Sequence, residues 1–181
     1  MAVHCEEYQS LLQLLRERCR NRPCRLIGID GAMQTGKSPL AERLAADLSG
    51  QAIHCDDHHP PTGYPYVAEL DIEAMRVILS APGPSPVIID AICLLGVLDR
   101  LACTADCLVY VFPQDLCAIE NDWFEDEIPL EQVLRDLGSD SGGALDREIA
   151  TYTKTRRPQD LADVTFRWRP MGAGGGGAVD G

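Results

Sequence analysis

The sequence predicts a three-layer α/β fold built on a mostly parallel sheet. Short apolar runs of strand length alternate with segments whose apolar residues recur at helical spacing, which is the pattern of βαβ units. A glycine-rich loop separates the first such strand from the helix that follows it, and aspartates lie at or just after the ends of two later strands. Ligands of open parallel sheets bind at the carboxyl ends of the strands. At 181 residues the chain has room for one medium-sized domain with its site at that edge.

The first predicted element is an amphipathic helix over residues 6–19, whose apolar side chains fall on one face. The run Arg20-Asn21-Arg22-Pro23 ends it. We expect residues 1–22 to form an N-terminal helix packed on the core and residues 23–170 to form the main domain. Residues 171–181, which contain the run GAGGGG, are expected to be a disordered tail.

The main domain is predicted to alternate strands with helices. The strands are expected at residues 25–30, 52–54, 87–90, 107–112 and 164–168. The helices are expected at residues 37–48, 72–79, 94–102 and 144–155, with a broken helix over 116–137 that is interrupted at Pro129. Asp71 is the candidate N-cap of the helix over 72–79. Residues 62–70 are expected to be an irregular loop, and residues 139–143 a flexible turn.

The glycine-rich loop carries the strongest functional signal. Residues 31–38 read GAMQTGKS, a full match to the P-loop pattern G-x-x-x-x-G-K-[ST], between a strand and a helix as the motif requires. Glycines let the backbone approach phosphates closely, and the loop amides and the helix N-terminus attract the anion. Lys37 is expected to reach the β- and γ-phosphates of ATP, and the Ser38 hydroxyl to ligate Mg²⁺. The residues expected to bind the nucleotide are Gly31, Ala32, Met33, Gln34, Thr35, Gly36, Lys37, Ser38 and Pro39.

Carboxylates at two strand ends are the candidates for metal binding and catalysis. Asp90 ends the apolar strand over 87–90, the position of a Walker-B-type carboxylate that holds Mg²⁺ directly or through water. Many strands also end in aspartate because the residue favours turns. One of Asp56 and Asp57, after the strand over 52–54, could accept the proton of an attacking hydroxyl. The alternative, which these residues alone slightly favour, is that both are solvated acids in a loop.

Charge and cysteine content exclude several classes of partner. A net charge of −12 argues against nucleic acid or an anionic membrane as the main partner, because both need clustered positive charge. No apolar run is long enough to span a membrane, and the first residues do not resemble a secretory signal, so we expect the protein to be cytoplasmic. The eight cysteines lack C-x-x-C spacing and are interpreted as buried thiols. Residues 54–59 (HCDDHH) are too contiguous for a structural zinc site.

Five segments resemble the uridine kinase and phosphoribulokinase group of P-loop kinases: IGIDGAMQTGKSPLAERLAADL, IHCDDHHPP, VIIDAICLL, CLVYVFP and YTKTRRPQDLADVTFRW. The resemblance extends from about residue 26 to residue 168 and implies a P-loop NTPase fold of the nucleoside and nucleotide kinase type. It places Asp56 at the catalytic base, Lys37 and Ser38 at the phosphate and Mg²⁺ contacts, and Asp90 at the acid of the third strand. It also brings Arg156 or Arg157 close to nucleotide or substrate.

Three departures from that group bear on function. His58 stands where an aromatic residue usually follows the acidic pair, and Pro39 stands where threonine is common. Related kinases carry several arginines after the fourth strand, whereas residues 114–134 contain no lysine or arginine. A cation acting on the transferring phosphate can contribute ~10³–10⁵-fold to the rate. Turnover should therefore be slow unless an arginine from elsewhere substitutes; the candidates are Arg135, Arg147, Arg156 and Arg157.

These observations favour an enzyme that transfers the γ-phosphoryl group of ATP, with Mg²⁺, to a hydroxyl of a small molecule such as a nucleoside or another alcohol. The alternative is a nucleotide-binding module with little or no catalysis, acting as a regulator or partner subunit. Residues that could contact the acceptor are Asp57, His58, Tyr64, Tyr66, Arg156 and Arg157. The histidine and the tyrosines could equally pack against the protein.

Overall fold

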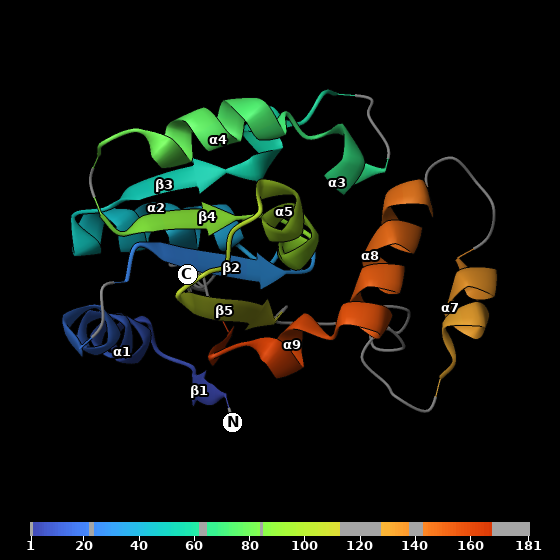
Figure 1. The fold of residues 1–181 in the computed structure, drawn as a ribbon. Helices are drawn as coiled ribbons and strands as arrows, with labels where there is room; N and C mark the ends of the chain where they lie inside the picture. The colour runs from blue at the N-terminus through green and yellow to red at the C-terminus, as the bar shows by residue number, and fades with distance from the viewer. Residues whose placement is uncertain are drawn as a thin grey trace, which may run out of the picture.

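The computed structural model describes residues 2–21, 24–61, 65–83, 85–112, 128–137 and 143–167. In these ranges the strands form one parallel six-stranded sheet with the order β1-β6-β5-β2-β4-β3 (Figure 1). The strands are β1 (Val3–Cys5), β2 (Leu26–Gly31), β3 (Gln51–His54), β4 (Val87–Asp90), β5 (Cys107–Phe112) and β6 (Val164–Arg167). The predicted α/β class with a mostly parallel sheet is confirmed.

Helices cover both faces of the sheet and give three layers. One face packs against α1 (Tyr8–Asn21) and α2 (Lys37–Leu48), whose leucines join β2, β5 and β6 in one apolar core. The opposite face packs against α4 (Ile72–Ser80), α5 (Leu94–Leu101) and α8 (Ala144–Arg156) in a second core. The shorter helices are η1 (Cys55–His58), α3 (Tyr66–Glu69), α7 (Leu130–Asp136) and α9 (Pro158–Leu161). Burial of apolar surface on both faces holds the sheet between its helices.

Strand register aligns the carboxyl ends of the central strands. β2 lies between β5 and β4, and Ile29 of β2 stands opposite Asp90 of β4. On the other side of β4, His54 of β3 is the register partner of the same Asp90. In Figure 1 the strand arrows point toward the side where α7 and α8 lie. The phosphate loop, η1 and Asp90 therefore share one edge of the sheet, as the sequence predicted.

Most predicted elements begin and end within two residues of the observed ones. In the N-terminal helix, Leu11 and Leu15 are completely buried and belong to the core shared with α2, β2, β5 and β6. Asp71 caps α4 by accepting a hydrogen bond from the Ala74 amide (3.0 Å), which confirms the predicted cap. The part of the predicted broken helix over 116–127, the predicted turn over 139–142, Trp168 and the tail over 171–181 lie outside the described residues.

Two structured segments were not predicted. β1 adds an edge strand beside β6, but Val3 and His4 are exposed, so the segment lacks an apolar strand pattern. The predicted irregular loop over 62–70 was wrong in its second half, because residues 66–69 form the single-turn helix α3. The start of α3 is hydrogen-bonded by Glu148 of α8, a tertiary contact with no local sequence signal.

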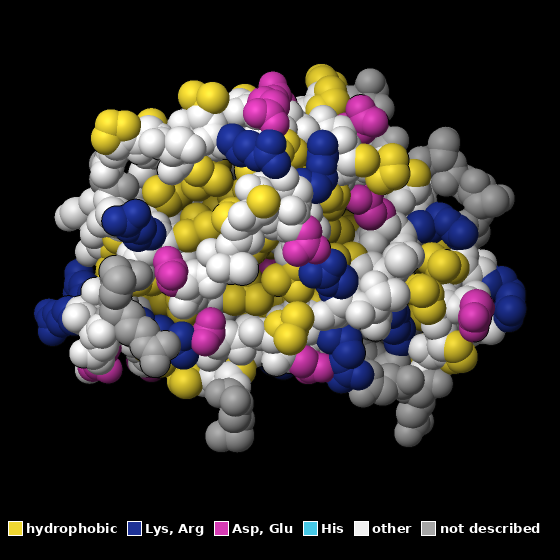
Figure 2. Space-filling model, in the orientation of Figure 1, with side chains coloured by type: hydrophobic (Ala, Val, Ile, Leu, Met, Phe, Trp, Pro, Cys, Tyr) yellow, Lys and Arg dark blue, Asp and Glu magenta, His cyan; other side chains and the backbone are white. Residues whose placement is uncertain are grey.

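The surface charges, the cysteines and the helix lengths can be compared with the expectations drawn from composition. Acidic and basic side chains are interspersed over the face drawn in Figure 2. Seven cysteines fall in the described ranges, all are free thiols and five are buried. No helix in the part of the chain that the structure describes is long and apolar enough to cross a membrane. The cytoplasmic location stays a prediction.

Candidate functional site

The phosphate loop is constrained at both ends by glycine. A Cβ at Gly31 (φ 150°) would lie 2.4 Å from the backbone oxygen of Val111, so a larger residue cannot occupy this position. Gly36 has a φ of 81° and caps α2 in the left-handed region, which also favours glycine. The loop therefore turns tightly from β2 into the N-terminus of α2, where backbone amides and the helix dipole favour an anion.

Lys37 is held inside this loop. The residue is 8% exposed, and Nζ donates a hydrogen bond to the Ala32 carbonyl oxygen (2.7 Å), which also accepts from the Thr35 hydroxyl (3.0 Å). Burial lowers the pKa of Lys37 below its usual value, while the nearby carboxylates of Asp30 and Asp90 act in the opposite direction. The position of Lys37 at the start of α2 and its hydrogen bond to Ala32 thus place the ammonium group at the phosphate loop.

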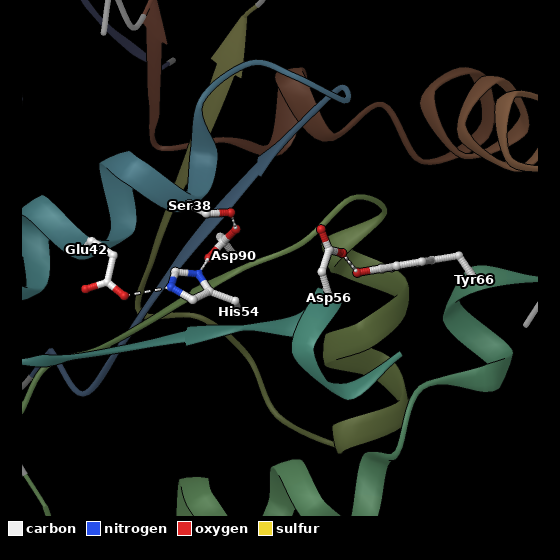
Figure 3. A network of polar contacts seen from close by, with 6 residues as sticks. All are labelled: Ser38, Glu42, His54, Asp56, Tyr66 and Asp90. Atoms are coloured by element: carbon white, nitrogen blue, oxygen red, sulfur yellow. Dashed lines mark hydrogen bonds and ion pairs between the residues drawn. The ribbon is translucent and has the colours of Figure 1, made fainter. Parts of the chain in front are cut away.

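A chain of polar contacts links the loop to the ends of β3 and β4. The Ser38 hydroxyl donates to Asp90 Oδ2 (2.8 Å), and His54 Nδ1 contacts Asp90 Oδ1 (Figure 3). His54 Nε2 contacts Glu42 Oε1 of α2 at 2.9 Å. Burial raises the pKa of Asp90, and the hydrogen bonds from His54 and Ser38 oppose that rise. The buried carboxylate is therefore held on both oxygens.

The Ser38–Asp90 pair fits the expected Mg²⁺ site. Mg²⁺ prefers oxygen ligands and is usually bound by one or two protein side chains together with substrate phosphates and water. The pair offers one hydroxyl oxygen and one carboxylate group beside the phosphate loop. The residues that the structure describes include no cluster of three or more His, Cys, Asp or Glu able to hold a metal ion.

His54 was not predicted as a partner of Asp90. The sequence placed it only in the contiguous run 54–59, and strand register alone brings it opposite Asp90. Burial lowers the pKa of His54, but its contacts with Glu42 and Asp90 outweigh this, and the pKa is raised overall. The sequence gives one signal for this pair: one strand ends in a histidine, and the strand next to it in the sheet ends in an aspartate.

A pocket of about 480 Å³ opens beside the phosphate loop. Its lining combines loop residues, one carboxylate, one lysine and an apolar wall. The lining residues are Met33, Gln34, Gly36, Lys37, Ser38, Pro39, Asp56, His59, Pro61, Tyr66, Ile92 and Leu145. Lys37 is the only lysine or arginine among these described residues. The structure thus brings the predicted nucleotide-binding loop and the predicted base to one cavity.

Asp56 enters the pocket from η1, the turn that follows β3. Its Oδ1 accepts a hydrogen bond from the Tyr66 hydroxyl (2.6 Å; Figure 3). The Tyr66 ring stacks on the His59 ring, with centroids 4.7 Å apart and planes 20° from parallel. His59 and Tyr66 therefore form the aromatic wall of the pocket next to Asp56.

Other predicted acceptor residues are not brought to this pocket. Asp57 and His58 lie on η1 but do not contribute to the lining. Arg156 bonds to Asp99 (2.7 Å), and Arg157 bonds to Asp160 (2.5 Å). Tyr64 lies outside the described residues.

A buried carboxylate lies just before the phosphate loop. Asp30 is 1% exposed, Oδ1 accepts from the Gly31 amide (2.8 Å), and Oδ2 accepts from the Tyr152 hydroxyl of α8. Burial raises the pKa of Asp30 to about 6, although the hydrogen bonds from Tyr152 and Gly31 act against the rise. The apolar run 26–30 ends in this acid, which is the sequence signal that could have identified it.

We expect Asp30 to make the fold less stable as the pH rises. The folded-state pKa exceeds the ordinary value of 3.8, so the folded protein keeps the proton longer and loses stability between about pH 4 and pH 7. A difference of about two pH units corresponds to at most ~3 kcal/mol. Urea unfolding across this pH range should show that loss in the wild type relative to Asp30→Asn. Parallel pH dependence in the two proteins would contradict the prediction.

Fold and site together define a P-loop protein of the three-layer α/β class. No protein-family model and no curated protein matches the sequence. Among solved structures, a possible uridine kinase from Bacillus stearothermophilus is similar, with 21% identity and a TM-score of 0.49 over 84% of this chain and 99% of that one. A gluconokinase from Sinorhizobium meliloti 1021 is similar with 17% identity and a TM-score of 0.45, over 82% and 86%. At these levels of sequence identity and structural similarity, function has to be inferred from the residues of the site.

Proposed function

We propose that the protein is a small-molecule kinase that transfers the γ-phosphoryl group of ATP to a hydroxyl. The observation that carries this proposal is the hydrogen bond from Ser38 to Asp90 (2.8 Å), made at the start of α2 beside a pocket that also contains Lys37 and Asp56. A phosphate-binding loop, a candidate Mg²⁺ site and a candidate base therefore meet in one place.

Each group has a distinct role in the proposed transfer. The loop amides and Lys37 hold the phosphates, and Ser38 and Asp90 would hold Mg²⁺, which neutralises charge on the phosphates when bound. Asp56 accepts the proton of the acceptor hydroxyl. The acceptor oxygen forms a bond to the γ-phosphorus as the bond to the ADP oxygen breaks, so the products are the phosphorylated acceptor and ADP.

The pocket wall supports a small alcohol with a flat or apolar part as the acceptor. His59 and Tyr66 present stacked rings, and Ile92 and Leu145 add apolar surface. Aromatic faces bind planar groups by stacking, while a neighbouring carboxylate can bind hydroxyls. A nucleoside or another ring-containing alcohol suits this combination.

The second candidate function is a nucleotide-binding module with little catalysis. Four arginines could substitute for the cations absent from residues 114–134, but all four are hydrogen-bonded elsewhere: Arg135 to Gln132, Arg147 to the Leu134 carbonyl, Arg156 to Asp99 and Arg157 to Asp160. None of them belongs to the described lining of the pocket. A regulator or partner subunit would need the phosphate loop but not these cations.

ADP release from Mg²⁺–ATP, measured across nucleosides, sugars and vitamin alcohols, separates the two functions. We expect one class of acceptor to stimulate ADP release, and the phosphorylated product to appear in equal amount. ATP binding without stimulation by any acceptor would favour the binding module.

A further inference from the structure

Tyr66 is hydrogen-bonded to the Asp56 side chain. The tyrosine is 4% exposed, whereas Asp56 is exposed toward the pocket, and their hydrogen bond is 2.6 Å long. Burial, and then the hydrogen bond to Asp56, raise the pKa of Tyr66 far above its usual value, so the phenol remains a donor. This bond occupies Oδ1 and leaves Oδ2 of Asp56 available to an acceptor hydroxyl.

Glu148 of α8 holds Tyr66 in turn. Its two carboxylate oxygens accept hydrogen bonds from the backbone amides of Tyr66 (2.5 Å) and Val67 (3.0 Å), the first residues of α3. These amides lack partners within the helix, so a carboxylate at this end stabilises the turn. The single turn of α3 is therefore attached to α8 at the residue that contacts Asp56.

The same helix is attached to the start of the phosphate loop. Tyr152 follows Glu148 by four residues and so lies on the same side of α8, and its hydroxyl contacts Asp30 and accepts from the Leu95 amide (3.1 Å). Asp30 in turn accepts from the Gly31 amide of the loop. One face of α8 thus supports both Asp56, through Glu148 and Tyr66, and the phosphate loop, through Tyr152 and Asp30.

We propose that Tyr66, held by Glu148, is the positioning residue that keeps Asp56 oriented toward the acceptor hydroxyl. This inference rests on the proposed kinase function for its catalytic meaning. A general base must lie within hydrogen-bonding distance of the proton it removes, and a side chain on a short surface turn needs neighbouring contacts to stay there. Tyr66 and Glu148 provide those contacts.

Nuclear magnetic resonance tests the positioning without requiring catalysis. In protein with ¹³C-labelled aspartate, the Asp56 carboxyl signal is identified by its loss in Asp56→Asn. We expect Tyr66→Phe and Glu148→Gln each to shift this signal. The matched control is Tyr8→Phe, which removes another buried tyrosine hydroxyl that donates to an aspartate (Asp47, 2.5 Å), and neither of these two residues lines the pocket. A signal that stays in place in Tyr66→Phe or in Glu148→Gln would overturn the proposal.

Steady-state kinetics with the identified acceptor tests the catalytic consequence. Tyr66→Phe keeps the ring that stacks on His59, so we expect kcat to fall about 10- to 100-fold with KM for ATP nearly unchanged. In the Asp56→Asn background the same substitution should have almost no further effect, because the group that it positions is gone. Losses that multiply in the double variant would show a general structural role and overturn the proposal. If the wild type transfers no phosphate, the kinase function fails, and the carboxyl signal still decides whether Tyr66 and Glu148 hold Asp56.

Discussion

Asp56→Asn should lower acceptor-dependent ADP release by ~10²–10⁴-fold, the usual contribution of a positioned general base. The amide cannot take a proton from the acceptor hydroxyl, yet it can still accept the hydrogen bond from Tyr66 that Asp56 accepts now. The phosphate loop, Lys37 and the Ser38–Asp90 pair are unchanged by the substitution. ATP should therefore bind nearly as well as to the wild type, and the loss should lie in kcat.

Asp57→Asn is the matched control for this variant. Asp57 is the neighbouring residue on the same turn, is also exposed, and does not belong to the described lining of the pocket. Turnover with the acceptor found in the panel, and ATP affinity by calorimetry, should be measured for both variants. Normal turnover in Asp56→Asn would show that Asp56 is not the base. A loss of turnover in Asp57→Asn alone would assign the role of the base to Asp57.

The half of the candidate site that contains the P-loop pattern could be predicted because its signals are local. The P-loop pattern lies within eight consecutive residues, and α2, β4 and β5 have the bounds that apolar periodicity predicted. Asp90 could be placed beside Ser38 because parallel strands end at a common edge. These inferences need only the order of residues along one element or the topology of the sheet.

The hydrogen bonds that hold the site residues in place could not be predicted, because they join residues far apart in sequence. Glu148 contacts α3 across 82 residues, and Tyr152 contacts Asp30 across 122. His54 reaches Asp90 only because of the register between β3 and β4. No periodicity marks such pairs, since each depends on how complete layers pack. The same limit explains why Arg156 and Arg157, assigned by position in a resembling segment, are paired with acids outside the pocket.

Because cations are scarce around the pocket, we expect the proposed nucleotide binding to depend most on Lys37. It is the only lysine or arginine among the described residues that line the pocket, and Asp30, Asp56 and Asp90 all act on it electrostatically. A phosphate that enters this acidic surrounding without the ammonium group would meet carboxylates of like charge. Removing Lys37 therefore takes away the attraction between the ammonium group and the phosphate, and it leaves the repulsion between the phosphate and the carboxylates.

We expect Lys37→Met to weaken Mg²⁺–ATP binding by roughly 10- to 100-fold, since a charged hydrogen bond contributes about 1.5–3 kcal/mol. Loss of charge stabilisation during transfer should lower kcat by a further ~10²–10³-fold. Methionine keeps most of the apolar stem, so the fold should survive, which thermal unfolding can check. The chain contains one other lysine, Lys154, which donates to the Ile128 carbonyl oxygen (2.8 Å) and does not line the pocket, so Lys154→Met is the control.

The wild-type protein offers an independent measurement of the same prediction. With two lysines in the chain, mild acylation of amines followed by mass spectrometry of peptides reports on each lysine separately. Mg²⁺–ATP should protect Lys37 in a saturable manner and leave the labelling of Lys154 unchanged, because only the loop ammonium would lie against phosphate. Equal labelling of Lys37 with and without nucleotide, together with unchanged ATP affinity in Lys37→Met, would mean that the loop does not bind ATP. Both the kinase and the nucleotide-binding module would then be rejected, since each depends on this contact.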